Sequence, residues 1–190
     1  MGKREEQRAN TKRAIVDAFE RLCQNSTYVH ISVADICAET GISKPTFYRH
    51  FQSKEHVILW LSERALDGGV ARIGKDLTWR QGYYLTFSIQ YEHRALFSDT
   101  QSSEVIASLF DFSNQHRLDT LISVIKDLTG SEPTGRLAFQ IEALLIMEGV
   151  INRRWAAAGM KMPVETLSDY MASTVPRELF DLLENAVSKR

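Results

Sequence analysis

Residues 43–51 bring hydroxyl, cationic and imidazole side chains together in a segment with helical spacing. At 100° per residue, Phe47 and Phe51 fall on one side of the helical wheel and must face a core. The opposite side and its flanks are made of Lys44, Pro45, Thr46, Tyr48, Arg49 and His50. Hydroxyls and cations bind phosphates, and Thr and Arg can also reach base edges. The face is therefore suited to DNA, although a solvated polar face on an ordinary helix would show the same pattern.

A second group of residues indicates an apolar site. Trp79, Tyr83, Phe87 and Tyr91 recur at every fourth position, which places four aromatic rings on one side of a helix. The stripe is either core packing or one wall of a ligand pocket whose hydroxyls orient the ligand. Further candidate wall residues are Phe110, Phe112, His116, Met147 and Asn152. Glu142 and Glu148 either orient a polar ligand or face solvent or a second copy of the chain.

The elements that must position these residues are helices. The chain has 190 residues with only 10 Gly and 4 Pro, and its apolar residues recur at helical spacing. Gly41-Ile42-Ser43 has the length and chemistry of the turn in a helix-turn-helix, and Ser32 can cap the helix before it. We expect helices at 4–23, 33–40, 44–51, 53–73, 78–93, 102–128, 133–158 and 163–187. Gly68-Gly69 interrupts the fourth of these, either as a hinge or as the end of the helix.

These elements predict an all-α protein in two parts, with residues 1–53 as a three-helix DNA-binding domain and residues 54–190 as a helical bundle. Residues 1–56 carry nine Lys/Arg against seven Asp/Glu, whereas the remainder carries fourteen against seventeen. This small asymmetry favours an anionic partner for the N-terminal part.

Several classes of protein are not supported by the sequence. It contains no G-x-S-x-G, H-E-x-x-H, P-loop or G-x-G-x-x-G motif, so we predict no enzyme, cofactor or metal site. The segment that begins the sequence has no apolar signal region, and no apolar run is long enough to cross a membrane. Cys23 and Cys37 fit buried free thiols. We expect a cytoplasmic protein.

Residues 41–51, GISKPTFYRHF, followed by Ser53-Lys54-Glu55, closely resemble the signature of TetR-type transcriptional regulators. The resemblance covers about a third of the chain and implies a homodimer that binds a near-palindromic operator in double-stranded DNA. It implies phosphate contacts from Ser32, Ser43, Lys44, Tyr48, His50 and Lys54. Pro45, Thr46 and Arg49 would lie nearest the base edges, with Pro45 standing where the family often has glycine.

The resemblance further implies a small-molecule pocket among the middle helices and a dimer interface formed by the last two predicted helices. The expected function is thus a ligand-responsive regulator, a repressor released from its operator by a small molecule. An adaptor that acts through protein partners, without an inducer, is the alternative. The exposed basic face at 44–50 argues against it, because an adaptor has no need of such a face.

Overall fold

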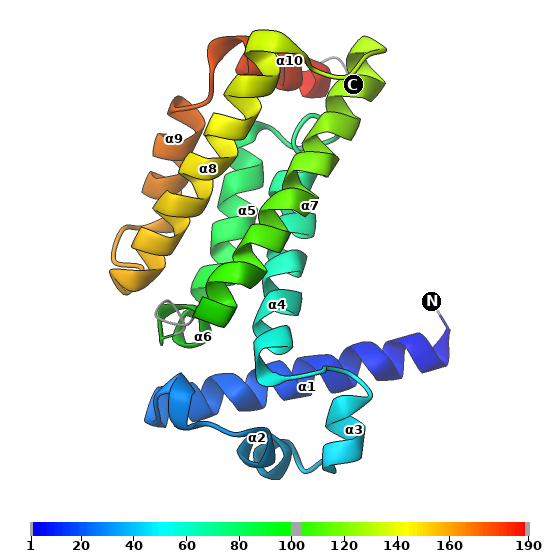
Figure 1. Ribbon diagram of the computed structural model, residues 1–190, viewed down its shortest axis with the longest axis vertical. Coiled ribbons are helices and arrows are strands. Elements are labelled where there is room, and N and C mark those ends of the chain that lie inside the picture. The colour runs from blue at the N-terminus through cyan, green and yellow to red at the C-terminus, as the bar shows by residue number, and fades with distance from the viewer. Residues whose placement is uncertain (1, 100–103, 189–190) are drawn as a thin grey trace.

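The computed structural model describes residues 2–99 and 104–188, except for the side chains of 99 and 104–114. Within these ranges the regular elements are helices, and the predicted all-α class is confirmed. The chain forms a small head at one end and an elongated bundle above it (Figure 1).

The head consists of α1 (Lys3–Asn25), the 3₁₀ turn η1 (Tyr28–His30), α2 (Val33–Thr40) and α3 (Lys44–Tyr48). Its completely buried apolar side chains include Ile15, Phe19, Ile36 and Phe47. The aromatic ring of Phe47 also contacts that of Phe51, with ring centroids 6.0 Å apart. One apolar core therefore fixes α3 against α1 and α2.

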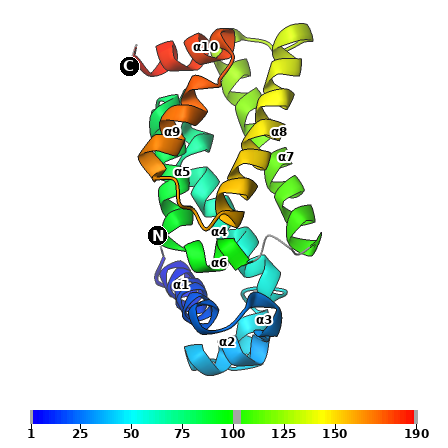
Figure 2. The same cartoon turned by 90° about the vertical axis from the view of Figure 1, so that its left-hand side faces the viewer.

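The long helix α4 (Lys54–Gly68) rises from the head into the body, where it packs against α5 (Trp79–Glu92) and α7 (Glu104–Thr129). The remaining elements of the body are α6 (Arg94–Asp99), α8 (Gly135–Ala157), α9 (Val164–Ser173) and α10 (Arg177–Ser188). Helices α5, α7, α8 and α9 stand roughly upright, and α10 crosses their upper end (Figures 1 and 2). The head also meets the body through α1 and α6.

Helix α4 ends at Gly68-Gly69. Of the two interpretations of these glycines, the end of the helix agrees with the structure. Gly68 is its last residue, and the 3₁₀ turn η2 (Val70–Arg72) follows. A Cβ atom at Gly69 would lie 2.5 Å from the Gly82 carbonyl oxygen and 2.7 Å from the Thr86 backbone nitrogen. Val70 N–H donates to Thr86 Oγ1 over 3.0 Å and fixes the same contact. Gly69 therefore permits α4 and α5 to approach closely, and an alanine at this position would collide with α5.

Three predicted helices differ from the observed ones. Helix α3 is shorter than 44–51, although backbone hydrogen bonds from Phe51 and His50 to the Phe47 carbonyl continue the turn. The predicted helix 163–187 is broken into α9 and α10 at Thr174–Pro176, because Pro176 has no N–H to continue the ladder. The predicted helix 53–73 stops at Gly68.

Candidate DNA-binding face and internal cavity

The turn before α3 follows from its residue types. Gly41 adopts a left-handed conformation with φ 74°, which costs glycine no steric strain, and it ends α2. Ser43 caps α3: its Oγ accepts from the Thr46 N–H over 3.3 Å and lies 3.0 Å from Thr46 Oγ1. Pro45 occupies the first turn, where no backbone donor is needed. These contacts are local, which is why the sequence could predict them.

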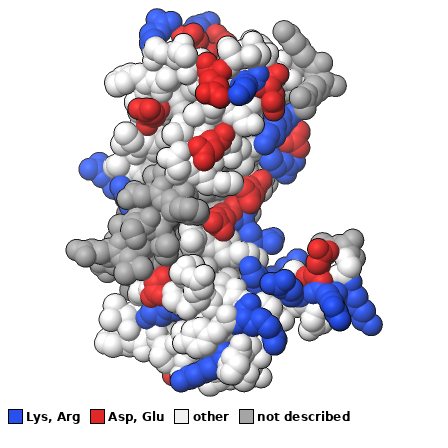
Figure 3. All heavy atoms as spheres, turned by 45° about the vertical axis from the view of Figure 1, so that its right-hand side comes forward, with Lys and Arg blue, Asp and Glu red and all other residues white. Residues whose placement is uncertain are grey.

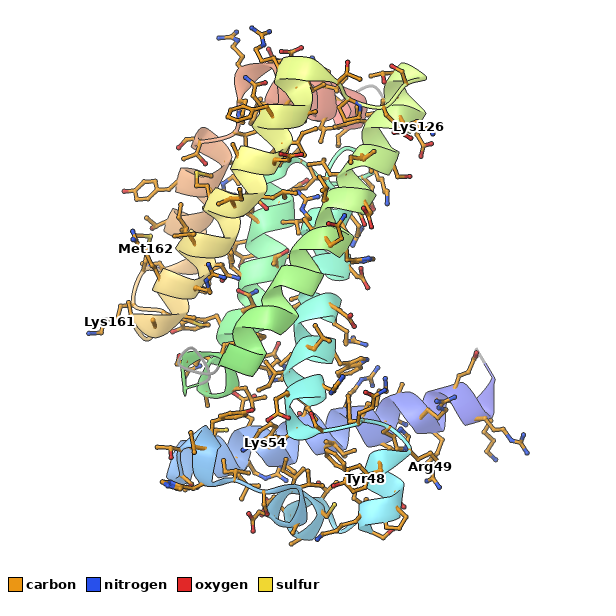
Figure 4. The ribbon with its side chains drawn as sticks, viewed as in Figure 1. Tyr48, Arg49, Lys54, Lys126, Lys161 and Met162 are labelled. Atoms are coloured by element: carbon orange, nitrogen blue, oxygen red, sulfur yellow. The ribbon has the colours of Figure 1, made fainter. Side chains whose placement is uncertain are left out.

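The outer face of α3 is exposed and basic. Ser43, Lys44, Pro45, Tyr48 and Arg49 are exposed, and the Tyr48 side chain keeps 54% of its accessible surface. Tyr48 and Arg49 lie at the lower end of the molecule (Figure 4). Lys and Arg side chains also gather there, on the face shown in Figure 3, along the projecting N-terminal half of α1. The arrangement offers cations and hydroxyls on one convex end of the molecule.

An open groove of about 520 Å³ runs between α1 and α3. It is lined by Gln7, Arg8, Thr11, Ile42, Thr46, Arg49 and His50. Thr46 and His50 are only partly exposed, because they form the floor of this groove. Burial lowers the pKa of His50, and the neighbouring Arg49, Arg8 and Lys12 lower it further. These effects favour the neutral form of His50, which can still form a hydrogen bond to a phosphate.

Ser32 and Lys54 have structural partners within the head. Ser32 caps α2 in a reciprocal arrangement with Asp35, whose carboxylate accepts from the Ser32 N–H over 2.8 Å. Lys54 Nζ donates to the carbonyl oxygens of Tyr28 (2.7 Å) and Ile31 (2.8 Å). The same ammonium lies 4.1 Å from the centroid of the Tyr28 ring. Lys54 thus ties the start of α4 to the loop before α2, and its ammonium is less available to an external anion than the exposed cationic groups of Lys44 and Arg49.

The aromatic stripe of α5 divides into buried and exposed rings. Trp79, Tyr83 and Phe87 are buried, whereas Tyr91 is 41% exposed. The rings of Tyr83 and Phe87 stack with centroids 5.9 Å apart. Only these two members of the stripe line a small internal cavity of about 50 Å³. Trp79 is completely enclosed by core residues, so at this position the core interpretation applies.

The other predicted pocket residues are scattered. His116 is exposed and contacts Asp67 over 3.3 Å, and Met147 packs against the core without lining the cavity. The side chains of Phe110 and Phe112 lie outside the described residues. Asn152 does line the cavity. Glu142 is exposed, whereas Glu148 points into the body and accepts a hydrogen bond from the Tyr83 hydroxyl.

Arg117 is the residue that the sequence interpretation missed. It lies on α7, its side chain is 3% exposed, and its Nε is 3.9 Å from Glu148 Oε2. Burial raises the pKa of Glu148 above its ordinary value, while Arg117 and the Tyr83 hydroxyl act in the opposite direction. Burial also raises the pKa of Tyr83, and its carboxylate neighbour adds to that effect. No sequence signal could identify this cluster, because its members lie on three helices that only the tertiary fold brings together.

The head and body together define an all-helical protein with an N-terminal helix-turn-helix. Residues 15–59 match the family model described as "Bacterial regulatory proteins, tetR family". This match lies over the segment whose residues resemble the tetR signature in the sequence. Within the described residues, no helix is long and apolar enough to cross a membrane.

Curated relatives match part of the chain. The HTH-type transcriptional regulator EthR of Mycobacterium tuberculosis is 32% identical over 93 residues, which cover 44% of this chain and 43% of EthR. DhaS of Lactococcus lactis, named as a transcriptional activator of the dhaKLM operon, is 40% identical over 53 residues, 28% of each chain. The matches thus span less than half the length of these relatives.

Solved structures resemble the chain over nearly its whole length. The dihydroxyacetone kinase operon activator DhaS superposes with a TM-score of 0.62 at 22% identity, covering 92% of this chain and 97% of the other. The tetR-family repressor AlkX of Dietzia gives 0.55 at 12% identity, covering 90% and 98%. At these identities the likeness concerns the fold. The curated relatives that match part of the chain are named as transcriptional regulators.

Proposed function

We propose that the chain is a DNA-binding transcriptional repressor that acts as a homodimer and is released from a near-palindromic operator by a small molecule. The observation that carries the proposal is the outer face of α3. Its exposed Lys44, Tyr48 and Arg49 stand on a helix that the buried Phe47 fixes rigidly. The N-terminal family match lies over the same segment.

The residues of this face would contact different parts of the DNA, according to their chemistry. Tyr48 and Lys44 flank it and would bind phosphates, which position a protein on DNA without regard to sequence. Arg49 and Thr46 would lie towards the base edges, with Pro45 beside them. The proposed contact set also includes Ser32, Ser43, His50 and Lys54. The side chain of His50 is only partly exposed, and Lys54 already donates to two backbone carbonyl oxygens.

The dimer would form through α8 and α9. Phe139 and Ile146 lie seven residues apart on one side of α8 and are 71% and 67% exposed, and Tyr170 on α9 is 59% exposed. Large apolar side chains in such a row are typical of a surface that a partner covers. A twofold dimer would place its two α3 helices about 34–36 Å apart, the spacing of successive major grooves on one side of the duplex.

A gel-shift titration with the DNA that flanks the protein's own gene tests the proposal. We expect binding to that DNA and much weaker binding to a scrambled fragment of the same length. Tyr48→Ala should weaken the binding, whereas Lys126→Ala, which removes a cation at the far end of the molecule (Figure 4), should not. Sedimentation should show a dimer at micromolar concentration. A monomer, or equal affinity for both DNA fragments, would refute the proposal.

A further inference from the structure

The cavity lies among five helices of the body and the turn η2. Its walls are Leu66, Val70, Tyr83, Thr86, Phe87, Arg117, Glu148, Gly149, Asn152 and Met171. Leu66 belongs to the last turn of α4, and Val70 to the turn that follows it. The cavity therefore touches the end of the helix that carries the head.

Arg117 brings unused hydrogen-bond donors to this cavity. Its side chain is 3% exposed, and its Nε and Nη2 atoms have no hydrogen-bond partner among the residues that the structure describes. These two nitrogens form one edge of the guanidinium plane, the edge that binds the two oxygens of a carboxylate side by side. A buried donor without a partner is costly, so a partner for this edge is expected.

Glu148 does not fill that position. Its Oε2 is 3.9 Å from Arg117 Nε, about 1 Å beyond a hydrogen bond between charged groups. Its other oxygen, Oε1, accepts from the Tyr83 hydroxyl, which holds the carboxylate towards α5. The Arg117 edge is thus aligned for an acceptor that the described residues do not supply.

We propose that this cavity binds a small organic acid, whose carboxylate accepts from Arg117 Nε and Nη2 and whose short apolar end packs against Val70 and Phe87. The proposal deepens the proposed function, because it names the chemical class of the effector. A carboxylate satisfies both donors with one planar group, whereas a carbonyl or hydroxyl oxygen satisfies them less completely.

Size and charge are consistent with such a ligand. At roughly 10–15 Å³ for each water-sized group, the cavity of about 50 Å³ holds about three to five non-hydrogen atoms. Propionate has this size. The buried guanidinium of Arg117 supplies the opposite charge for a carboxylate, and burial raises the pKa of the neighbouring Glu148.

The position of the cavity also gives a bound ligand a structural connection to the head. An acid in the cavity would contact Val70 and Leu66, and Gly69 between them is fixed against α5 by close backbone contacts. A ligand that widens this space would displace the end of α4, since little free volume remains between α4 and α5. The displacement would be transmitted along α4 to the head and its helix α3.

Calorimetric titration of the full-length protein tests the proposal with sodium propionate as the probe. Propionamide, which has the same shape without the charge, and sodium chloride at equal ionic strength are the reference solutes. We expect propionate to bind at least about tenfold more tightly than either, the preference of a charge-assisted bidentate pair over a single neutral contact. Equal binding of propionamide, equal binding of chloride, or no binding of propionate would each overturn the proposal.

Two variants test the role of Arg117. Arg117→Lys keeps the charge but removes the two-donor edge, and it should weaken propionate binding about tenfold; Arg136→Lys, at an exposed position of α8, is the matched control. Glu148→Gln removes the competing carboxylate and should strengthen binding about threefold or more. A folded Arg117→Lys protein with unchanged affinity would contradict the proposal. If Arg117→Lys does not fold, the outcome for Glu148→Gln decides, and no gain in affinity would contradict it.

Operator binding by the wild-type protein without acid is measured in parallel. If the wild-type protein binds propionate but does not bind the DNA, only the proposed function is refuted. Normal DNA binding with no propionate binding would refute only the inference about the effector.

Discussion

The head and the body of this molecule differ in the kinds of side chain that they bury. In the head, Phe19, Ile36 and Phe47 form a core in which these side chains are completely enclosed, and the polar groups lie outside it. In the body, a guanidinium, a carboxylate and a phenol are enclosed together beside a cavity. The head is therefore suited to hold one fixed surface, whereas the body has a buried site whose polar groups can gain partners.

This difference indicates which part of the molecule can adjust its conformation. A completely packed core leaves no space to adapt, so its exposed face stays in one geometry. A cavity with unsatisfied donors stores unfavourable free energy that a ligand can relieve. Binding energy gained in the body is then available to shift the position of the head.

The largest effect is expected from the head core. Phe47→Ala should destabilise the protein by about 3–5 kcal/mol, because it removes a fully buried ring that joins α3 to α1 and α2. Chemical denaturation followed by circular dichroism measures the free energy of unfolding. Tyr48→Ala, one residue along and 54% exposed, is the matched control and should change it by less than about 1 kcal/mol. Similar losses from the two variants would contradict a head organised on Phe47.

Gly69→Ala tests the junction between the two regions. The added Cβ would collide with backbone atoms of Gly82 and Thr86, so we expect a loss of about 1–3 kcal/mol or more. Gly68→Ala is the control, because its Cβ would meet only Ile89 Cδ1 at an ordinary 3.5 Å. Gly68→Ala should leave the free energy of unfolding unchanged or increase it by up to about 1 kcal/mol. Thermal unfolding of both variants distinguishes close packing from a hinge, for which both would behave alike.

Arg49→Ala should alter the preference of the head for DNA sequences. We expect a loss of about 1–3 kcal/mol on the preferred operator and a smaller loss on others, because Arg49 is placed towards the bases. Tyr48→Ala should instead weaken binding to all sequences alike. Binding to a library of operator variants separates the two patterns, and a uniform loss for Arg49→Ala would remove it from the base-reading group.

The smallest effect concerns an ion pair between the regions, His93 at the end of α5 and Glu20 on α1. The hydrogen bond with Glu20 raises the pKa of His93 above 6.5, against the lowering effect of burial. A raised folded-state pKa stabilises the protein fully below pH 6.5, and this contribution is lost as the pH rises through the folded-state value. Unfolding free energies at pH 6 and pH 8 should differ less in His93→Gln than in the wild type. An identical pH dependence would show that the pair contributes nothing.

The sequence predicted the head better than the body for a physical reason. Gly41, Ser43 and Pro45 act through contacts within a few residues, so their spacing alone indicates the turn and the start of α3. Pro176 also acts locally, but the apolar spacing on both sides of it continued and concealed the break between α9 and α10. The roles assigned to residues 32–54 on DNA stay predictions.

The body could not be predicted at the same level. Arg117 meets Glu148 only because α7 packs beside α8, and Gly69 is required only because α5 passes close to it. A periodic pattern records which side of a helix is apolar, but it does not record which helix lies opposite. Three rings of the stripe on α5, those of Trp79, Tyr83 and Phe87, are buried, and the ligand contacts assigned to the stripe stay predictions.

The central claim is that the head binds DNA while the body adjusts it, and one comparison of affinities tests this most directly. Fluorescence anisotropy with labelled DNA from beside the gene gives the dissociation constants of the wild type, of Tyr48→Ala/Arg49→Ala and of Arg117→Lys without any added acid. We expect the double head variant to bind about 100-fold more weakly, from about 1–3 kcal/mol for Arg49 plus a smaller loss for Tyr48, and the body variant to stay within about threefold of the wild type. Retained affinity in a folded head variant would contradict the claim.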